Sequence, residues 1–335
     1  MLPVVVSREN VVTLDVLFAG SFFPSATNYL REALPDVRVA VANPATDDVL
    51  PAARILVPLM TRIDGAVMDR VDDLRIVHQW GAGLEGVDIP AATARGIAVA
   101  NIPTTTSGNA ASVAEWCVMA ALAMSRQLLD HKAIMANGTT WGSPVGQGLR
   151  GRTAGIVGFG GIGQALAKRL VPFETRVIVA TRTPDAELAA SLGVDSVVGM
   201  DQFDAFLAEV DYVFLTLPLT PETRHLMDAR TFALLKAGAY AINVGRGGLV
   251  DHEALLAALD DGHLAGAALD VFAQEPLDPT SPLIAHPKTL VSPHIAGVTD
   301  VFYRHAAQRF VDALARLRTG APLDFAINWS AISGQ

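Results

Sequence analysis

The sequence has little cysteine, no concentrated positive charge and no long apolar run. Its single cysteine, Cys117, can form no disulfide within the chain, which fits a reducing compartment. Because Cys117 sits in the apolar stretch 112–124, it also suits the role of a small core side chain. Acidic residues outnumber basic ones, 34 to 25, and no Lys/Arg run occurs. A nucleic-acid partner needs a concentrated basic face, so we expect none.

Membrane attachment is not expected either. No apolar stretch reaches the length of about 20 residues that a bilayer-spanning helix needs. The first ten residues lack the basic region of a signal peptide. We therefore expect a cytoplasmic protein. With 335 residues, the chain is long enough for two domains that each bury a core.

Short β-rich runs separated by turn-forming stretches fill the first hundred residues. Their spacing leaves room for crossover helices, which predicts a parallel sheet. A long helix is expected from about residue 107, with Asn109 or Ser112 as its cap. The expected strands are 11–19, 37–42, 55–59, 74–80 and 97–101.

A second series of strands follows the turn-rich segment 137–151. Helical patterns at about 162–172, 201–209, 229–236 and 251–260 alternate with several of these strands, so this half is predicted to be doubly wound. The expected strands are 154–159, 177–181, 212–217, 240–244, 265–271 and 290–291.

A glycine-rich turn connects the first strand of the second series to a helix. Gly158 permits a tight turn, Gly160 lets the backbone approach a pyrophosphate, and Gly163 allows the helix to pack on its strand. Backbone N–H groups of Gly161, Ile162 and Gly163 would face the anion. This context predicts dinucleotide binding, and a merely structural turn is the alternative.

The end of the next strand bears on the choice of nicotinamide cofactor. An acidic residue there would hydrogen-bond the ribose and repel a 2′-phosphate. This chain instead has Thr181 and Arg182, a hydroxyl and a guanidinium that suit a phosphate. We therefore favour NADP, with NAD possible. The alternative is that Arg182 is a solvated charge, with Asp185 as the next acidic residue.

Further motifs make the chain resemble the D-isomer-specific 2-hydroxyacid dehydrogenase family, over about residues 55–328. The resemblance is carried jointly by the glycine turn and four further segments. These segments are 217–226 (LPLTPETRHL), 242–251 (INVGRGGLVD), 269–276 (LDVFAQEP) and 292–297 (SPHIAG).

The resemblance implies an oxidoreductase that transfers hydride between NAD(P)H and a small 2-keto or 2-hydroxy acid, such as glyoxylate or hydroxypyruvate. The resemblance also implies that Arg246 binds the carboxylate and keto oxygen of the substrate, that His294 is the general acid/base, and that Glu275 hydrogen-bonds His294. The chemistry agrees, because a planar guanidinium can donate to both the carboxylate and the keto oxygen. Histidine can protonate the developing alkoxide, and a neighbouring carboxylate orients its ring and favours its protonated form.

The resemblance also implies the remaining contacts. Backbone N–H groups of Ala82 and Gly83 would hold the substrate carboxylate, while Leu59 and Met60 would face its side chain. No metal is expected, and the family suggests a homodimer. The further expected cofactor contacts are Leu217, Pro218, Thr223, Val244, Gly245, Asp270 and Gly297.

The overall prediction is an α/β protein with two Rossmann-like domains. Residues 105–300 would form a doubly wound NAD(P)-binding domain. Residues 1–104 would form a flavodoxin-like substrate domain. Residues 301–335 are assigned to the substrate domain, since a helical tail from residue 300 is expected to return to it.

Three alternatives to this function stay open. Asn109 matches a position that formate dehydrogenases of the same superfamily use, but those enzymes have glutamine where this chain has Glu275. Formate oxidation needs no proton transfer, so a carboxylate beside histidine favours the hydroxyacid chemistry. A nucleotide-sensing, corepressor-like binding protein is a second alternative. An inert scaffold is the third, although it would have no use for these catalytic side chains.

Overall fold

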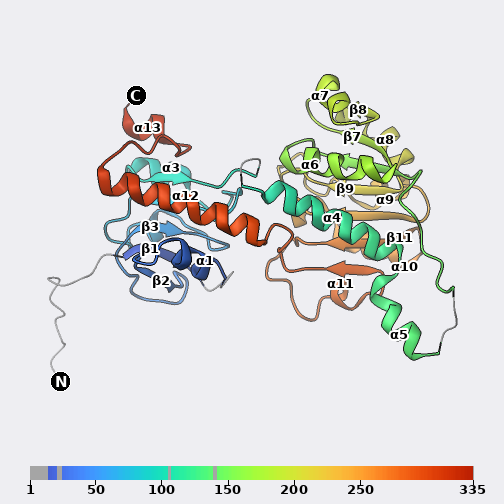
Figure 1. The fold of residues 1–335 in the computed structure, drawn as a ribbon, viewed down its shortest axis with the longest axis horizontal. Coiled ribbons are helices and arrows are strands. Elements are labelled where there is room, and N and C mark those ends of the chain that lie inside the picture. The colour runs from blue at the N-terminus through green and yellow to red at the C-terminus, as the bar shows by residue number, and fades with distance from the viewer. Residues whose placement is uncertain (1–13, 21–24, 105–106, 139–141, 335) are drawn as a thin grey trace. The chain divides into compact units, whose positions relative to one another are not determined.

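The computed structural model describes residues 14–20, 25–104, 107–138 and 142–334. The chain divides into two compact units, residues 1–107 with 300–335 and residues 108–299 (Figure 1). Among the described residues, no helix is long and apolar enough to cross a membrane.

The first unit contains a five-stranded parallel sheet in the order β2-β1-β3-β4-β5. This is the flavodoxin-like order that the sequence predicted. Its strands are β1 (Leu14–Ala19), β2 (Val39–Ala42), β3 (Ala53–Val57), β4 (Ile76–His78) and β5 (Ala98–Ala100). Its helices are α1 (Ser25–Ala33), α2 (Gly65–Met68), α3 (Ile89–Ala94), α12 (Asp300–Thr319) and α13 (Trp329–Ser333).

Helix α12 brings the C-terminal part of the chain back to this sheet. It packs against α1, and the ring of Phe310 lies 4.4 Å from the ring of His78 on β4. His78 is 1% exposed. Burial lowers its pKa to about 4, and the charge of Arg309 acts in the same direction. Helix α12 thus contributes to the hydrophobic core of the first unit.

The second unit contains a seven-stranded parallel sheet in the order β12-β11-β10-β9-β6-β7-β8. Numbered from β6, this is the doubly wound order 3-2-1-4-5-6 with one added edge strand. Its strands are β6 (Thr153–Val157), β7 (Arg176–Ala180), β8 (Ser196–Val198), β9 (Tyr212–Leu215), β10 (Ala239–Asn243), β11 (Leu264–Leu269) and β12 (Thr289–Val291). Its α-helices are α4 (Asn109–Ser125), α5 (His131–Ala136), α6 (Gly161–Leu170), α7 (Ala186–Ser191), α8 (Phe203–Glu209), α9 (Ala229–Leu234), α10 (His252–Asp260) and α11 (Pro282–Ala285).

Helices cover both faces of this sheet, and its strands divide their side chains between two cores. In β9, Tyr212 and Phe214 belong to one hydrophobic cluster, whereas Val213 and Leu215 belong to the other. Such two-sided burial explains why these strands read as apolar runs rather than alternating patterns. Cys117 lies in the first of these clusters, where burial raises the pKa of its thiol.

Three local features differ from the sequence-based expectations. The cap of α4 was predicted wrongly, because Gly108, with φ 73°, is the cap residue and offers no side chain. Asn109 is the first helical residue, and the Ser112 hydroxyl bonds to the Gly108 carbonyl and to Thr299. The strand β8 and the helix α7 were not predicted, because β8 is an edge strand without a fully buried side chain and α7 buries only Ala189, so neither shows an apolar pattern.

Candidate active site

The glycine-rich turn joins β6 to α6. Gly158 has φ 94°, which favours glycine. A Cβ atom on Gly163 would lie 2.3 Å from the Gly158 carbonyl oxygen, so only glycine lets α6 approach its strand this closely. A Cβ atom on Gly158 would likewise lie 2.9 Å from Cβ of Leu217. The turn is therefore packed against β6 and the segment after β9.

The N-terminus of α6 has the features of an anion cradle. Gly160 is its cap residue and offers no side-chain hydrogen bond to the first N–H groups, which include those of Gly161 and Ile162. A Cβ atom on Gly160 would have nothing within 4 Å, so the backbone is open to close approach. N–H groups without a side-chain cap, at the positive end of a helix, fit the pyrophosphate of a nicotinamide cofactor.

The tip of β7 presents cationic and hydroxyl groups without a competing carboxylate from Asp185. The backbone N–H of Thr181 donates to the Val198 carbonyl, and Arg182 is exposed. The carboxylate of Asp185 accepts from the Leu188 N–H at 2.9 Å and thereby caps α7. Asp185 therefore serves the helix rather than the strand tip.

Glu222 is an acidic neighbour of Arg182 that the sequence did not indicate. Its pKa lies below the ordinary value, first because the Thr220 hydroxyl donates to it. The positive charge of Arg182 contributes in the same direction. Glu222 therefore lies within the electric field of the guanidinium at the tip of β7.

Arg246 follows β10 in a turn that is held from two sides. The side chain of Asn243 accepts from the Gly245 N–H and donates to the Arg246 carbonyl, both at 3.0 Å. A Cβ atom on Gly247 would lie 1.8 Å from the Phe272 carbonyl carbon, so the Arg246 turn packs directly on the loop after β11. Sequence reasoning missed the positioning role of Asn243, although it lies inside the motif.

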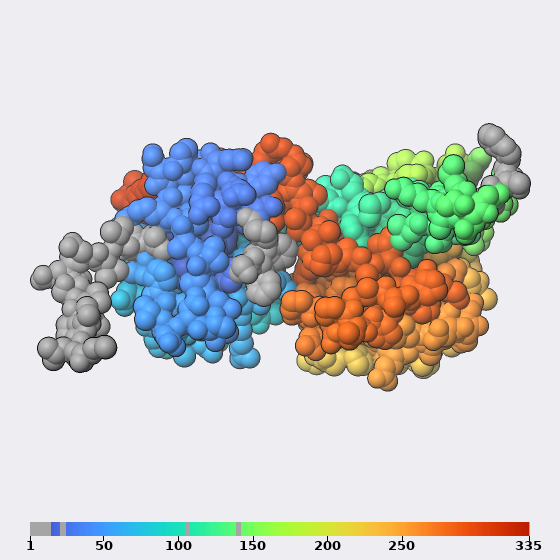
Figure 2. Space-filling view, turned by 90° about the horizontal axis from the view of Figure 1, so that it is seen from below, coloured from blue at the N-terminus to red at the C-terminus, as the bar shows by residue number. Residues whose placement is uncertain are grey.

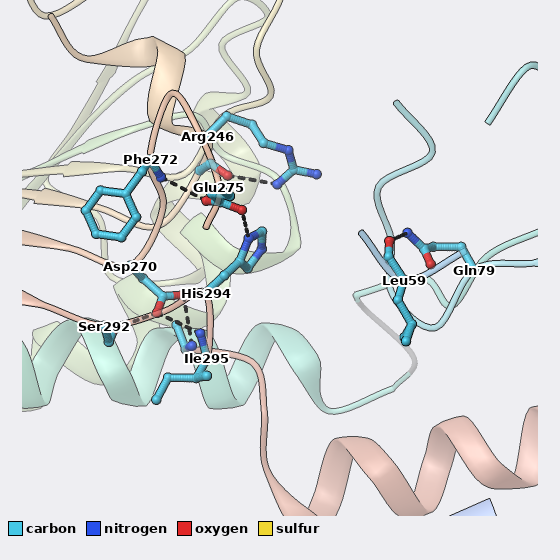
Figure 3. Close-up of polar contacts among 11 residues, drawn as sticks. Leu59, Gln79, Arg246, Asp270, Phe272, Glu275, Ser292, His294 and Ile295 are labelled. Atoms are coloured by element: carbon cyan, nitrogen blue, oxygen red, sulfur yellow. Dashed lines mark hydrogen bonds and ion pairs between the residues drawn. The ribbon is translucent and has the colours of Figure 1, made fainter. Parts of the chain in front are cut away.

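Glu275 and His294 form the central contact of the site (Figure 3). His294 Nδ1 lies 2.8 Å from Glu275 Oε2, and Glu275 Oε1 accepts from the Phe272 N–H at 2.8 Å. Burial raises the pKa of Glu275, but the hydrogen bond and charge of His294, with smaller effects from Phe272 and Arg246, outweigh it and lower the pKa. The carboxylate is therefore held ionised beside the imidazole.

Asp270 holds the backbone of the His294 loop. Its carboxylate accepts from the Ser292 hydroxyl at 2.5 Å and from the N–H groups of Ile295 and Ala296 at 2.8 and 2.9 Å. Burial raises its pKa, and these hydrogen bonds offset that effect only in part. Sequence reasoning gave no role to Ser292, and the contact of Asp270 with a cofactor stays a prediction.

The remaining predicted cofactor residues lie on loops at the carboxyl end of the same sheet. Thr223 donates to the Pro218 carbonyl, which ties the loop after β9. Val244 is buried, and a Cβ atom on Gly245 would lie 2.6 Å from the Leu217 carbonyl oxygen. A Cβ atom on Gly297 would lie 2.2 Å from the side-chain nitrogen of Asn109. These loops therefore depend on close backbone packing.

The predicted substrate residues belong to the first unit. Leu59 is 6% exposed and Met60 is 44% exposed. The Leu59 carbonyl accepts from the Gln79 side chain at 2.8 Å, and the Ala82 carbonyl accepts from the Asn101 side chain at 2.6 Å. Both segments follow carboxyl ends of neighbouring strands, β3 and β4, so they lie at one edge of the sheet. Their contact with a substrate stays a prediction.

No group of three or more His, Cys, Asp or Glu side chains that could hold a metal occurs within the described part of the chain.

Comparison with known proteins identifies the class. Residues 118–296 match the family described as D-isomer specific 2-hydroxyacid dehydrogenase, NAD binding domain. A glyoxylate reductase from Thermofilum pendens is 37% identical over 271 residues, which cover 78% of this chain and 76% of the relative. A D-3-phosphoglycerate dehydrogenase from Mycobacterium bovis is 38% identical over 290 residues, or 85% of this chain. The match covers about half, 53%, of that longer protein.

Two solved structures are similar to this chain over most of its length. A D-isomer specific 2-hydroxyacid dehydrogenase from Xanthobacter autotrophicus Py2, in complex with NADPH and MES, is 28% identical, with a TM-score of 0.70 over 94% of this chain and 98% of that chain. A formate dehydrogenase from Granulicella is 26% identical, with a TM-score of 0.76 over 88% of this chain and 80% of that chain.

The fold and site thus define a nicotinamide-dependent oxidoreductase with a doubly wound cofactor domain. The chain belongs to the D-isomer specific 2-hydroxyacid dehydrogenase family. It transfers hydride between NAD(P)H and a small 2-keto or 2-hydroxy acid.

Proposed function

We propose that the enzyme reduces a short 2-keto acid, such as glyoxylate or hydroxypyruvate, with NADPH as the preferred cofactor. The observation that supports this proposal most strongly is the 2.8 Å contact between His294 Nδ1 and Glu275 Oε2. Formate oxidation requires no proton transfer, whereas keto-acid reduction does, and an ionised carboxylate beside histidine serves proton transfer. The apolar Leu59 and Met60 suit a short substituent better than a phosphorylated one.

Each step of the reduction has a group in the proposed site. Arg246 binds the substrate carboxylate and polarises the keto oxygen, because its fork of N–H groups matches both acceptors. NADPH, when bound, supplies the hydride that reaches C2. His294 donates its proton to the keto oxygen, which gives the 2-hydroxy acid. Glu275 binds the Nδ1 side of the ring, so it orients Nε2 toward the substrate and stabilises the charged ring.

A substrate panel tests the reaction. We expect glyoxylate or hydroxypyruvate to oxidise NADPH, measured as loss of absorbance. His294→Ala and Arg246→Ala should each reduce turnover by about a hundredfold or more, with NADPH binding largely retained. His305→Ala, which removes an exposed histidine on α12, serves as the control. The proposed activity would be excluded if the enzyme turned over none of the 2-keto acids. It would also be excluded if the enzyme reduced NAD with formate and acted on no 2-keto acid.

The preference for NADPH is proposed from Thr181 and Arg182 at the tip of β7. The exposed guanidinium of Arg182 can pair with a 2′-phosphate, while Asp185 is engaged in capping α7. We expect Arg182→Ala to lower kcat/KM with NADPH by about tenfold and to change the NADH value little. Arg150→Ala removes an exposed arginine elsewhere in the second unit and is the matched control. Higher kcat/KM with NADH in the unaltered enzyme would contradict the preference.

A homodimer is proposed from exposed apolar side chains of the second unit. Leu128, Leu129, Met135 and Val145 are 55%, 68%, 78% and 86% exposed, and the green segment around α5 lies at the surface in Figure 2. Several large apolar side chains exposed in one part of the chain favour burial against a partner. Light scattering should give twice the chain mass, and Leu129→Asp should lower it. A monomeric mass for the unaltered protein would refute the dimer.

A cytoplasmic location is proposed from the cysteine usage. The single cysteine, Cys117, is buried and unpaired, as suits a reducing compartment. Fractionation of cells should place the protein with cytoplasmic markers, and enrichment in an oxidising compartment would contradict this location.

A further inference from the structure

The first unit carries an arginine-lined hollow that the proposed reduction does not use. Three guanidinium groups line it, and they come from Arg54 in β3, Arg75 just before β4 and Arg318 in the last turn of α12. Asp73 and Leu317 are the other described residues that line it. The volume, about 450 Å³, falls in the range of small-molecule sites. Because Leu317 is the single apolar side chain among the described lining residues, the hollow suits a polar ligand.

The hollow lies at the amino-terminal edge of the five-stranded sheet. Arg54 is the second residue of β3, and Arg75 immediately precedes β4. The residues predicted to contact the substrate, Leu59 and Ala82, follow the carboxyl ends of these same strands. Parallel strands place all their amino ends at one edge, so the hollow and the predicted substrate residues lie at opposite edges of this sheet. The hollow is therefore a separate site.

One carboxylate within the hollow positions two of the arginines. Asp73 Oδ1 lies 3.1 Å from Arg75 Nη2, and Asp73 Oδ2 lies 3.8 Å from Arg54 Nε. Asp73 has φ 63°, a left-handed conformation that is uncommon for a residue other than glycine. Strained backbone of this kind persists where surrounding structure holds it and is concentrated at functional sites.

The third arginine shares its carboxylate with another cation. Arg318 Nη2 lies 3.8 Å from Asp15 Oδ1. The side chain of Asp15 is 5% exposed and already pairs with Arg38 Nε at 3.3 Å. It also accepts the Arg38 backbone N–H at 3.0 Å. In the hollow and its ion pairs, four guanidinium groups therefore share two carboxylates, which leaves a surplus of positive charge.

We propose that this hollow binds a phosphate group, either as inorganic phosphate or on a small metabolite. Guanidinium groups donate paired hydrogen bonds to phosphate oxygens, and a dianion would balance the surplus charge. The side chains of Arg54, Arg318 and Arg75 are 36%, 52% and 65% exposed, so solvent-borne ligands can reach all three.

Isothermal titration calorimetry with inorganic phosphate, at constant ionic strength, tests the proposal on the full chain. The unaltered protein should bind saturably. Arg75→Gln and Arg318→Gln should each weaken binding by about tenfold or more, because a charge-assisted contact is lost. Arg31→Gln removes the same charge from an exposed position on α1, outside the hollow, and should leave the affinity unchanged. Circular dichroism of each variant verifies folding.

Glycerol 3-phosphate, which is not a 2-keto or 2-hydroxy acid, distinguishes the two sources of phosphate. Tighter binding than inorganic phosphate, with the same loss in Arg75→Gln, would identify a metabolite site. Equal or weaker binding with that loss would identify a site for the free ion. Absence of saturable binding by both ligands, or equal weakening by Arg31→Gln, would overturn the proposal. Because the readout is binding, the result is independent of whether the enzyme reduces a 2-keto acid.

Discussion

At the scale of single residues, His294 combines a strained backbone with several anchoring contacts. Its φ is 56°, which is uncommon for a side chain with a Cβ atom. Its N–H donates to the Asp270 carbonyl at 2.8 Å, and Nδ1 contacts Glu275. Such strain costs about 1–3 kcal/mol and persists because the neighbouring contacts determine the conformation. The ring is thus held before any substrate arrives.

Glu275→Gln tests the electrostatic part of this arrangement. Glutamine can still accept from His294 Nδ1, but it lacks the charge that stabilises a protonated ring. We expect the rate of keto-acid reduction at neutral pH to fall by about tenfold or more. Glu253→Gln, an exposed change on α10, is the control for the steady-state rates. An unchanged rate in Glu275→Gln would contradict the role of the carboxylate.

At the scale of elements, the β6–α6 turn separates two uses of glycine. Gly163 is required for packing, since its Cβ atom would collide with the Gly158 carbonyl oxygen. Gly160 has φ −75° and open space around its missing Cβ atom, so packing does not require glycine there. Its value must then lie in what approaches the turn from outside, which fits the close approach of a pyrophosphate.

Alanine at these two positions should separate stability from cofactor binding. Gly163→Ala should lower the free energy of unfolding by about 1–3 kcal/mol, because the backbone must shift. Gly160→Ala should leave the melting temperature nearly unchanged while it weakens NADPH binding by about tenfold, because the methyl group occupies the approach path. Thermal denaturation and cofactor titration of both variants provide the comparison. Equal destabilisation by the two changes would refute this division of roles.

At the scale of the whole molecule, acid stability depends on His78 in the core completed by α12. The pKa of this buried histidine is lowered to about 4 in the folded chain, against an ordinary value of 6.5. Between these values the unfolded chain binds the proton and the folded chain does not. The free energy of unfolding therefore rises with pH in this window and is lost as pH falls from about 6.5 toward 4.

The loss should reach about 3 kcal/mol when pH 4 is compared with pH 7. His78→Phe, which keeps a ring against Phe310, should remove this part of the slope in urea denaturation measured across the window. His305→Gln, on the exposed side of α12, should retain it. An identical slope in His78→Phe and the unaltered protein would exclude His78 as the source.

Much of the second unit was predictable from local patterns. Its apolar runs and the glycine turn indicated a doubly wound sheet, which the strand order confirms. The strand β8 and the helix α7 were missed, since neither buries enough apolar side chains to show a pattern. The cap of α4 was also missed, because Gly108 caps through backbone conformation rather than through a hydroxyl or amide that a sequence pattern displays.

The sequence by itself determined the family, the parallel topology and which side chains carry the proposed chemistry. These depend on short-range spacing, such as the turn from Gly158 to Gly163, and on residue type. The contact between His294 and Glu275 was expected from the family resemblance, but only the tertiary structure decided that Asp270 ties the His294 loop and that distant arginines share one hollow. Such contacts join segments separated along the chain, so they form only when the strands and helices pack together.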